Sequence, residues 1–290
     1  MIKVKNAVIM AAGTSSRFAP LSYEKPKALI RVKGEVLIER QIMQLQEAGI
    51  RDIYIVTGYK ANMFDYLKEK FNVYLRYNHE YDVRNNNSSI KVVEDIIGDT
   101  YICSADNYFS KNPFSSYEDC GYYAAVYSEG PTKEWCLSED LHGYIDKVYI
   151  GGKHCWYMLG HTFWDKTFSS RFIKILNHDY DLPGMAEKLW EDIYIEHLDE
   201  LKLKIRKYPA NIIFEFDSLD ELRQFDTSYI NHTGSSILAS IAEKMTVQEG
   251  AIINISSLKG KGNQAIGFTF KVHEDNYRYL YSEKEIVSLK

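Results

Sequence analysis

The chain has 290 residues, which is enough for one large domain or for a domain with an appendage. An apolar content of 45% supports a full hydrophobic core, and a net charge of −5 argues against a nucleic-acid partner, which requires a basic face. No apolar stretch reaches membrane-spanning length, no signal-peptide core is present, and the four cysteines lack Cys-x-x-Cys spacing. We therefore expect a cytoplasmic protein with reduced thiols, no zinc site and no membrane partner.

The most informative segment covers residues 7–30. The apolar run 7–10 predicts a buried strand, after which come residues with small side chains, three hydroxyls and a cation: Ala11, Ala12, Gly13, Thr14, Ser15, Ser16 and Arg17. A second cation, Lys27, follows after a short loop. Small residues let backbone N–H groups approach an anion closely, and the two cations neutralise it. The segment therefore predicts a cradle for a nucleoside triphosphate.

This segment resembles the start of the nucleotidyltransferases with a GT-A-like fold, and most closely the bacterial phosphocholine cytidylyltransferase branch, which includes 2-aminoethylphosphonate cytidylyltransferases. The residues that match the signature are Gly13, Arg17, Pro20, Leu21, Pro26 and Lys27. Ser15 departs from the commoner form, which has a second glycine there. The resemblance covers about residues 5–226, and it implies an α/β fold with a Rossmann-like mixed, mostly parallel sheet.

Strands and helices alternate through the first half of the chain. The pattern predicts helices over residues 37–48, 62–71 and 88–97, and strands over 52–57, 73–77 and 100–105. Their lengths suit parallel crossovers, so a mostly parallel sheet is expected.

The resemblance gives roles to the residues of this half. Arg17 and Lys27 are the expected catalytic residues, because they neutralise the phosphates and the departing pyrophosphate. The expected nucleotide-binding residues are Ala11, Ala12, Gly13, Thr14, Ser15, Ser16, Tyr59, Asn86, Ser88 and Ala105. For the asparagine-rich stretch around Asn86, an ordinary loop is an equally good interpretation.

Two aspartates are candidate ligands for Mg²⁺, the expected cofactor. Asp106 follows the predicted strand 100–105, and Asp217 follows another strand directly before the capping-box residue Ser218. The resembled family has metal-binding aspartates at both places. Oxygen ligands from a few carboxylates suit Mg²⁺. The competing interpretation makes each residue a solvated turn or cap residue.

The second half reads as more antiparallel and is expected to bind the acceptor. Strands are predicted over 122–127, within 143–151, and over 156–163, 201–207 and 211–216, and helices over 167–177, 184–198 and 219–225. The resemblance implies a pocket for a choline-like cation lined by Glu134, Trp135, Tyr157, Trp190 and Asp192. Aromatic faces beside carboxylates suit such a head group. Core packing is the competing interpretation for each tryptophan.

Residues 227–290 are predicted to form a small α+β appendage. A helix is expected over 235–245, and strands over 251–258, 265–272 and 277–281. The stretch 258–279 resembles the opening hairpin of choline-kinase-type proteins. The kinase catalytic loop would lie beyond residue 290, so kinase activity does not follow. The segment is interpreted as the remnant of a fusion partner, with a dimerisation or lid element as the alternative.

These features predict a nucleotidyltransferase domain over 1–226, with a nucleotide half (1–120) and an acceptor half (121–226), followed by the appendage. The expected reaction transfers CMP from CTP to phosphocholine, and the expected partners are therefore small molecules. The alternative acceptors are 2-aminoethylphosphonate and phosphoethanolamine. A hexose-1-phosphate nucleotidylyltransferase and a non-catalytic nucleotide-binding regulator remain as other interpretations, and a homodimer is compatible with the sequence.

Overall fold

The computed structural model describes residues 1–260 and 265–289. Two compact units divide the chain: residues 1–13 with 37–215 form the first unit, and residues 14–36 with 216–290 form the second. The predicted domain boundary at residue 226 lies inside the second unit, and the domain assignment stays a prediction. Among the described residues, no helix combines the length and the apolar character needed to cross a bilayer.

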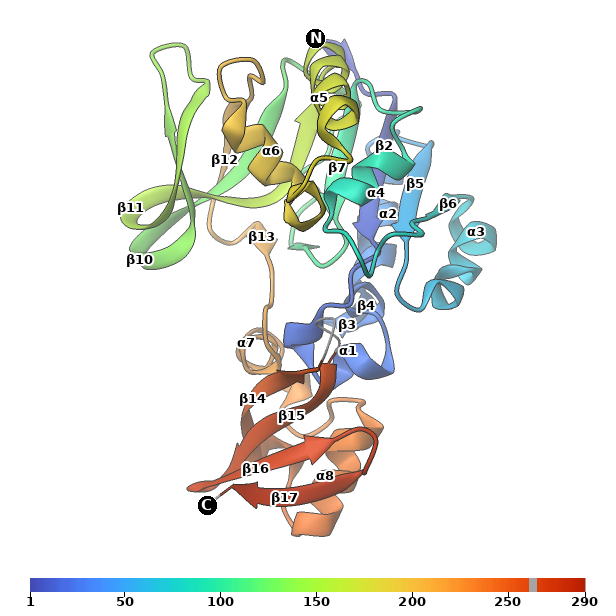
Figure 1. The fold of residues 1–290 in the computed structure, drawn as a ribbon, viewed down its shortest axis with the longest axis vertical. Helices are drawn as coiled ribbons and strands as arrows, with labels where there is room; N and C mark the ends of the chain where they lie inside the picture. The colour runs from blue at the N-terminus through green and yellow to red at the C-terminus, as the bar shows by residue number, and fades with distance from the viewer. Residues whose placement is uncertain (261–264, 290) are drawn as a thin grey trace. The chain divides into compact units, whose positions relative to one another are not determined.

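A seven-stranded sheet is the centre of the first unit (Figure 1). Its strands, in spatial order, are β12 (Lys204–Tyr208), β10 (Tyr122–Glu139), β11 (Ile145–Trp164), β7 (Thr100–Ser104), β2 (Asn6–Ala11), β5 (Ile53–Thr57) and β6 (Tyr74–Tyr77). The four strands from β7 to β6 pair in parallel, whereas β11 is antiparallel to both of its neighbours. The predicted α/β fold with a mixed, mostly parallel sheet is confirmed.

The helices of the first unit cover this sheet. They are α2 (Leu37–Glu47), α3 (Tyr66–Phe71), α4 (Asn87–Val92), α5 (Lys166–Asp179) and α6 (Trp190–Glu196), with single 3-10 turns η3 (Ala61–Phe64) and η4 (Met185–Glu187). Figure 1 shows α4, α5 and α6 on the same face of the sheet. Val8 of β2, Phe172 of α5 and Trp190 of α6 belong to one buried cluster. Burial on both faces explains why β2 reads as a continuous apolar run.

The β10–β11 hairpin differs from the prediction. Two separate strands were expected within 143–151 and over 156–163, but β11 is continuous across both, and β10 extends well beyond 127. The pairing contains several register shifts, and Gly151 has a φ of 76°. A glycine in the left-handed region lets a strand bend without ending, so the sequence shows a break where the strand only bends.

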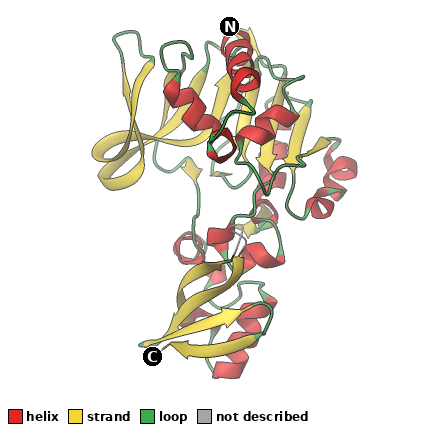
Figure 2. Ribbon diagram, in the orientation of Figure 1, coloured by secondary structure: helices red, strands yellow, loops and turns green. Residues whose placement is uncertain are grey.

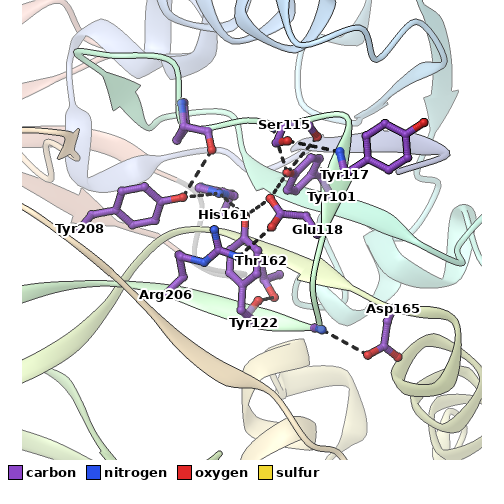
Figure 3. Close-up of polar contacts among 12 residues, drawn as sticks. Tyr101, Ser115, Tyr117, Glu118, Tyr122, His161, Thr162, Asp165, Arg206 and Tyr208 are labelled. Atoms are coloured by element: carbon purple, nitrogen blue, oxygen red, sulfur yellow. Dashed lines mark hydrogen bonds and ion pairs between the residues drawn. The ribbon is translucent and has the colours of Figure 1, made fainter. Parts of the chain in front are cut away.

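A buried polar network ties the strands of this half together (Figure 3). The carboxylate of Glu118 in β9 (Tyr117–Glu118) accepts hydrogen bonds from Tyr101, from Tyr122 at 3.1 Å and from Arg206 at 2.7 Å. Burial and, to a smaller extent, the charge of Arg206 lower the pKa of His161 to about 3. The ring of His161 is therefore neutral at pH 7. Because a buried charge that loses its partner is costly, this network holds β7, β9, β10, β11 and β12 in one arrangement.

Two short strand pairs complete the first unit. β1 (Ile2–Lys3) pairs with β9, and β8 (Tyr108–Phe109) pairs with β13 (Ile213–Phe214), both antiparallel. The second pair carries Glu215 next to the turn that follows β7, where Asn107 donates to its Oε2 atom at 3.3 Å.

The second unit joins the loop 14–36 to the C-terminal segment. Its helices are α1 (Leu21–Glu24), α7 (Leu219–Phe225) and α8 (Ser236–Met245), with the 3-10 turns η1 (Ser16–Phe18), η2 (Lys27–Leu29), η5 (Thr227–Tyr229) and η6 (Glu249–Ala251). The strands are β3 (Arg31–Val32) and β4 (Glu35–Val36), which pair with each other, and the antiparallel sheet of β14 (Ile252–Lys259), β15 (Ala265–Val272), β16 (Asp275–Leu280) and β17 (Glu285–Leu289) (Figure 2).

Most elements predicted for residues 227–290 are present. The helix and the first three strands are confirmed, whereas β17 was missed because its surroundings are rich in charge and only two of its residues are half-buried. Leu238 and Ile241 of α8 are fully buried, as are Phe268 and Phe270 of β15. The part of the kinase-like hairpin at residues 261–264 lies outside the described residues.

Candidate functional site

The start of the triphosphate cradle lies at the carboxyl end of β2. Tyr59 donates its backbone N–H to the carbonyl of Ala12 at 3.0 Å, which fixes the turn after β5 against the cradle. A Cβ atom on Gly58 would lie 2.5 Å from the Cβ of Tyr81 and 2.9 Å from that same carbonyl, so only glycine fits there. A Cβ on Gly13 would meet nothing within 4 Å, so the cradle backbone is accessible at this point.

The backbone conformation of Ser15 accounts for the departure from the family signature at this position. It has a φ of 47°, in the left-handed region, where a residue with a side chain costs about 1 kcal/mol more than glycine. The backbone shape that a second glycine would favour is therefore kept, and a hydroxyl is added to the loop.

The predicted catalytic cations lie in the second unit. Arg17, in η1, donates to the Oδ2 atom of Asp217 at 2.7 Å, and both side chains are exposed to solvent. An exposed ion pair contributes about 0–1 kcal/mol, so either partner is readily released to a phosphate or a cation. Lys27, in η2, is buried, and its Nζ atom lies 5.5 Å from the ring centroid of Phe18.

Asp217 keeps its carboxylate outside the helix cap that follows. The predicted capping at Ser218 is confirmed, since its hydroxyl accepts the N–H of Glu221 at 3.2 Å. The carboxylate of Glu221 in turn accepts the backbone N–H of Asp217 at 2.8 Å. The backbone of Asp217 is thus held at the start of α7, and its Oδ2 atom faces Arg17.

Asp106 lies in the turn after β7, at the carboxyl edge of the sheet. Ser104 donates its hydroxyl to the Oδ1 atom of Asp106 at 2.6 Å. The amide of Gln41 donates to the carbonyls of Ser104 and Asn107, each at 2.8 Å, and the N–H of Ala105 bonds to Met10. The turn is therefore fixed by buried hydrogen bonds, and the carboxylate is oriented by its neighbour.

The donors at Asp106 and Asp217 fit Mg²⁺. Both offer carboxylate oxygens, which this ion prefers, and Mg²⁺ is usually held by one or two carboxylates together with phosphates and waters. No group of three or more His, Cys, Asp or Glu side chains is gathered for a metal anywhere in the part of the chain that the structure describes. The two residues belong to different units, and their sharing of one ion stays a prediction.

A cavity of about 170 Å³ opens inside the first unit. It lies where β2 and β7 end, between the β10–β11 hairpin and α6. Its polar side chains come from distant parts of the sequence: Asn86, Ser104, Asn107, Tyr123, Thr162, Glu191 and Glu215. The cavity therefore begins at the turn that carries Asp106 and continues to residues of the predicted acceptor half.

Glu191 is the most unusual group of this cavity. Burial raises the pKa of its carboxyl to about 7, although hydrogen bonds from Asn86 and from Tyr123 act in the opposite direction. Asn86 donates to Oε2 at 3.0 Å, and its own carbonyl accepts the N–H of Trp190 at 2.7 Å. A buried carboxylate with a raised pKa gains most from a cation placed beside it. The cavity is therefore suited to a positively charged head group.

The predicted acceptor residues lie in different surroundings. Trp190 lines the cavity, is only 1% exposed and stacks on Tyr123 with ring centroids 5.7 Å apart. Tyr157 and Trp135 are half-buried in the hairpin, and Glu134 is exposed. The carboxylate of Asp192 accepts the N–H of Leu189 at 2.7 Å and thus caps α6. These roles in acceptor binding stay predictions.

Of the polar residues that line the cavity, sequence reasoning predicted only Asn86 and missed six: Ser104, Asn107, Tyr123, Thr162, Glu191 and Glu215. No pattern in the sequence singled out Glu191, because it and Asp192 are adjacent acids. In the structure Asp192 caps α6 through the N–H of Leu189, and Glu191 lines the cavity. Glu215 lies two residues before Asp217, but nothing in the sequence places it beside Asn107.

The asparagine-rich stretch carries much of the local structure. Asn78 donates to the hydroxyl of Ser88 at 2.8 Å, and Asn85 and Asn87 bond to backbone carbonyls of residues 185–188. These bonds attach the start of α4 to the segment before α6, so they shape the cavity wall. The predicted contacts of Tyr59, Asn86, Ser88 and Ala105 with the nucleotide stay predictions.

A mostly parallel sheet, a small-residue cradle at the end of β2 and an aspartate in the turn after β7 are together typical of a nucleotidyltransferase. A family model described as nucleotidyl transferase matches residues 6–121. The choline-phosphate cytidylyltransferase of Streptococcus pneumoniae is 33% identical over 220 residues, which is 76% of this chain and 96% of that protein. The chain therefore belongs to the nucleotidyltransferase family, with cytidylyltransferases among its relatives.

Two further comparisons agree. The 2-aminoethylphosphonate cytidylyltransferase of Lancefieldella rimae is 36% identical over 234 residues, covering 78% of this chain and 93% of the relative. A solved structure of the CTP:phosphocholine cytidylyltransferase from Streptococcus pneumoniae matches with a TM-score of 0.74 at 33% identity. That match covers 78% of this chain and 99% of the solved chain. The predicted family resemblance is confirmed.

Proposed function

We propose that this protein transfers CMP from CTP to phosphocholine, giving CDP-choline and pyrophosphate. The observation that carries the proposal is the cavity beside the turn of Asp106, with the buried carboxyl of Glu191 in its wall. Relatives named as choline-phosphate cytidylyltransferases, from Streptococcus pneumoniae and Haemophilus influenzae, support the choice of nucleotide and acceptor.

The reaction sets a phosphate oxygen of the acceptor against the α-phosphorus of CTP. A new P–O bond forms, the bond from the α-phosphorus to the bridging oxygen breaks, and pyrophosphate leaves with the electron pair. Because the acceptor phosphate is already ionised, no strong general base is required. The protein must hold the two substrates in line and neutralise charge. The cradle residues 11–16 bind the phosphates, and Arg17 and Lys27 neutralise the departing pyrophosphate.

Asp106 and Asp217 are the proposed ligands of Mg²⁺. Bound there, the ion supplies charge neutralisation and orientation for the triphosphate. Ser104 orients Asp106 by its hydrogen bond, and the contact of Asp217 with Arg17 is exposed enough to open when substrate binds. Asp106 is positioned by β7, which precedes it, and Asp217 by α7, which follows it.

Glu191 and Glu215 are the proposed partners of the choline cation. Their charges attract the head group, and the ring of Tyr123 lines the same cavity. A hexose phosphate has no cation to satisfy a buried carboxylate, so the same groups would disfavour it.

A second candidate acceptor is 2-aminoethylphosphonate. It is favoured by the hydrogen-bonding groups of the cavity, because Glu191, Glu215 and Asn107 offer oxygens to an N–H of a primary ammonium. The relative from Lancefieldella rimae carries this name.

Pyrophosphate release from CTP and Mg²⁺ tests the proposal. Phosphocholine, 2-aminoethylphosphonate, phosphoethanolamine and glucose-1-phosphate are offered separately, and kcat/KM is compared. The highest value is expected for phosphocholine, whereas the highest value for 2-aminoethylphosphonate would select the second candidate. Preference for glucose-1-phosphate would overturn the acceptor assignment, and release with none of the four would contradict the enzymatic function.

A further inference from the structure

The loop that carries both catalytic cations is packed with the end of the chain. Residues 14–36 lie between β2 and α2 in sequence, yet they form one compact unit with residues 216–290. Alignment with the pneumococcal relative covers 96% of that protein but only 76% of this chain, so this chain has residues without a counterpart there. Several contacts join the loop to the C-terminal segment.

An aromatic stack joins α1 to the four-stranded sheet. The rings of Tyr23 and Tyr281 lie 3.7 Å apart between centroids, at an interplanar angle of 10°. Tyr281 directly follows β16, is only 8% exposed and donates its backbone N–H to Ile266 of β15 at 3.0 Å. Its ring is thus fixed by the sheet, while Tyr23 belongs to the loop.

Polar contacts hold the loop at two further points. The carboxylate of Glu24, at the end of α1, accepts the N–H groups of Ser236 at 2.8 Å and Ile237 at 3.3 Å. These are the first N–H groups of α8, a ten-residue helix, where a negative charge is stabilised. A buried carboxylate, that of Asp226, accepts the N–H of Lys33 at 2.6 Å.

A hydroxyl supplies the last of these contacts. Tyr229, in η5, donates to the carbonyl of Arg31 at 2.5 Å. Residues 23 and 24 on one side and 31 and 33 on the other are therefore held by the C-terminal segment, and Lys27 lies between them in the chain. The loop backbone around this lysine is fixed by residues from the distant C-terminal part of the chain.

We propose that the C-terminal segment positions the cationic loop for catalysis, with Tyr281 as the principal positioning residue. The ring of Tyr281 holds α1, and α1 lies between the turns η1 and η2 that carry Arg17 and Lys27. The segment acts through the loop and need not touch the nucleotide. This inference rests on the proposed nucleotidyl transfer, and it gives a role to residues that were interpreted as the remnant of a fusion partner.

Three variants of the full chain test the inference. Tyr281→Ser removes the stacked ring, Tyr281→Phe keeps it, and Tyr277→Ser is the matched control because Tyr277 stacks on Phe270 within the same sheet. Each is measured for kcat and KM with CTP, for KM with phosphocholine, for Tm and for hydrogen exchange in peptides covering residues 14–36. If Tyr281 only stabilised the fold, Tyr281→Ser would lower Tm, and the kinetic constants for CTP and for phosphocholine would not change differently from each other.

For Tyr281→Ser we expect kcat/KM for CTP to fall roughly tenfold, because a displaced cation no longer meets the phosphates. Exchange in 14–36 should become faster, while the phosphocholine KM stays within about twofold, since the acceptor cavity belongs to the first unit. Tyr281→Phe should restore the wild-type values, and Tyr277→Ser should leave them unchanged. If Tyr281→Ser is recovered unfolded, Tyr281→Leu, which keeps apolar volume without a ring, carries the same expectations.

Unchanged kinetics and unchanged exchange in Tyr281→Ser would overturn the inference. An equal loss in Tyr277→Ser would also overturn it, because the effect would then be general destabilisation. Failure of the proposed function is distinguished by the wild type, which would release no pyrophosphate from CTP, whereas the exchange of residues 14–36 would still report whether Tyr281 fixes the loop.

Discussion

Glu191 in the first unit and the pair of Arg17 and Asp217 in the second differ in how far their charges are exposed. In the first unit, Glu191 is half-buried in the wall of a cavity, and desolvation there raises the pKa of its carboxyl to about 7. In the second, Arg17 and Asp217 are paired in the open, with side chains 73% and 40% exposed. A buried charge gains a great deal from the right cation and rejects a neutral group, whereas an exposed charge is exchanged cheaply. Burial thus suits recognition of the head group, and exposure suits the transient contacts of a triphosphate.

The largest effect is expected for Asp106→Asn. Asparagine keeps the shape and an oxygen for the hydroxyl of Ser104 but loses the charge that holds Mg²⁺. We expect kcat to fall by about 10²–10³-fold, the usual effect of removing one electrostatic stabiliser. Pyrophosphate release at saturating CTP measures it. Asp65→Asn, at an exposed aspartate paired with Lys68, is the control, and equal rates in both variants would contradict a metal-binding role.

Lys27→Ala should have the next largest effect. Its charge is needed most when pyrophosphate leaves, so kcat should fall by roughly 10²-fold while the affinity for CTP changes less. Single-turnover kinetics together with CTP binding separates the two quantities. Lys25→Ala, two positions away at an exposed lysine, serves as the control. An unchanged kcat in Lys27→Ala would remove this residue from the mechanism.

Glu191→Gln tests the other side of the comparison. Loss of the buried charge should raise the KM for phosphocholine about tenfold, which corresponds to about 1.4 kcal/mol. The KM for CTP should change little. Glu196→Gln, at an exposed glutamate of the same helix paired with Lys188, is the control. If the two variants raise the acceptor KM equally, the cavity does not bind the cation through Glu191.

The pH dependence gives the smallest effect. Because the carboxyl of Glu191 titrates at about 7 in the folded protein, above its ordinary value of 4.5, it loses its proton as pH rises through 7. The KM for phosphocholine should therefore fall roughly several-fold as the pH is raised from slightly acidic to slightly alkaline. Since the acceptor phosphate also titrates in this range, the comparison is with Glu191→Gln, in which this part of the change is absent. Identical profiles would refute the assignment.

The raised pKa of Glu191 also determines whether the free energy of unfolding rises or falls with pH. The folded state binds the proton of Glu191 more tightly than the unfolded state does, so the free energy of unfolding decreases as pH rises from the ordinary carboxyl pKa to about 7. Tm measured across this window should therefore decline more steeply in the wild type than in Glu191→Gln. Parallel curves would show that the carboxyl is not held in its buried environment.

The fold was predictable because local patterns specify it. The apolar run at β2, followed by alternating helices and strands, is enough to predict a mostly parallel sheet. The errors occur where local signals mislead. Gly151 interrupts the pattern of β11 without ending the strand, and β17 has few buried residues.

The site was predictable only in part. The cradle residues and Asp106 are adjacent to strand ends, so their position follows from the sequence. Sequence reasoning assigned Asp192 to the acceptor site, whereas Glu191 lines the cavity. The two residues are one helix position apart, about 100° around the axis, and composition cannot tell which of them faces the cavity. The stack of Tyr23 on Tyr281 joins residues from opposite ends of the chain, and no local pattern indicates it.

The central claim is that Asp106 and Asp217 hold one Mg²⁺ on the triphosphate that the cationic loop binds. The most direct measurement is a crystal structure of the full chain with Mg²⁺ and a non-hydrolysable CTP analogue. The account predicts a carboxylate oxygen of each aspartate at about 2.1 Å from a single ion. An ion that contacts only one of the two residues, or a triphosphate bound away from Arg17 and Lys27, would contradict it.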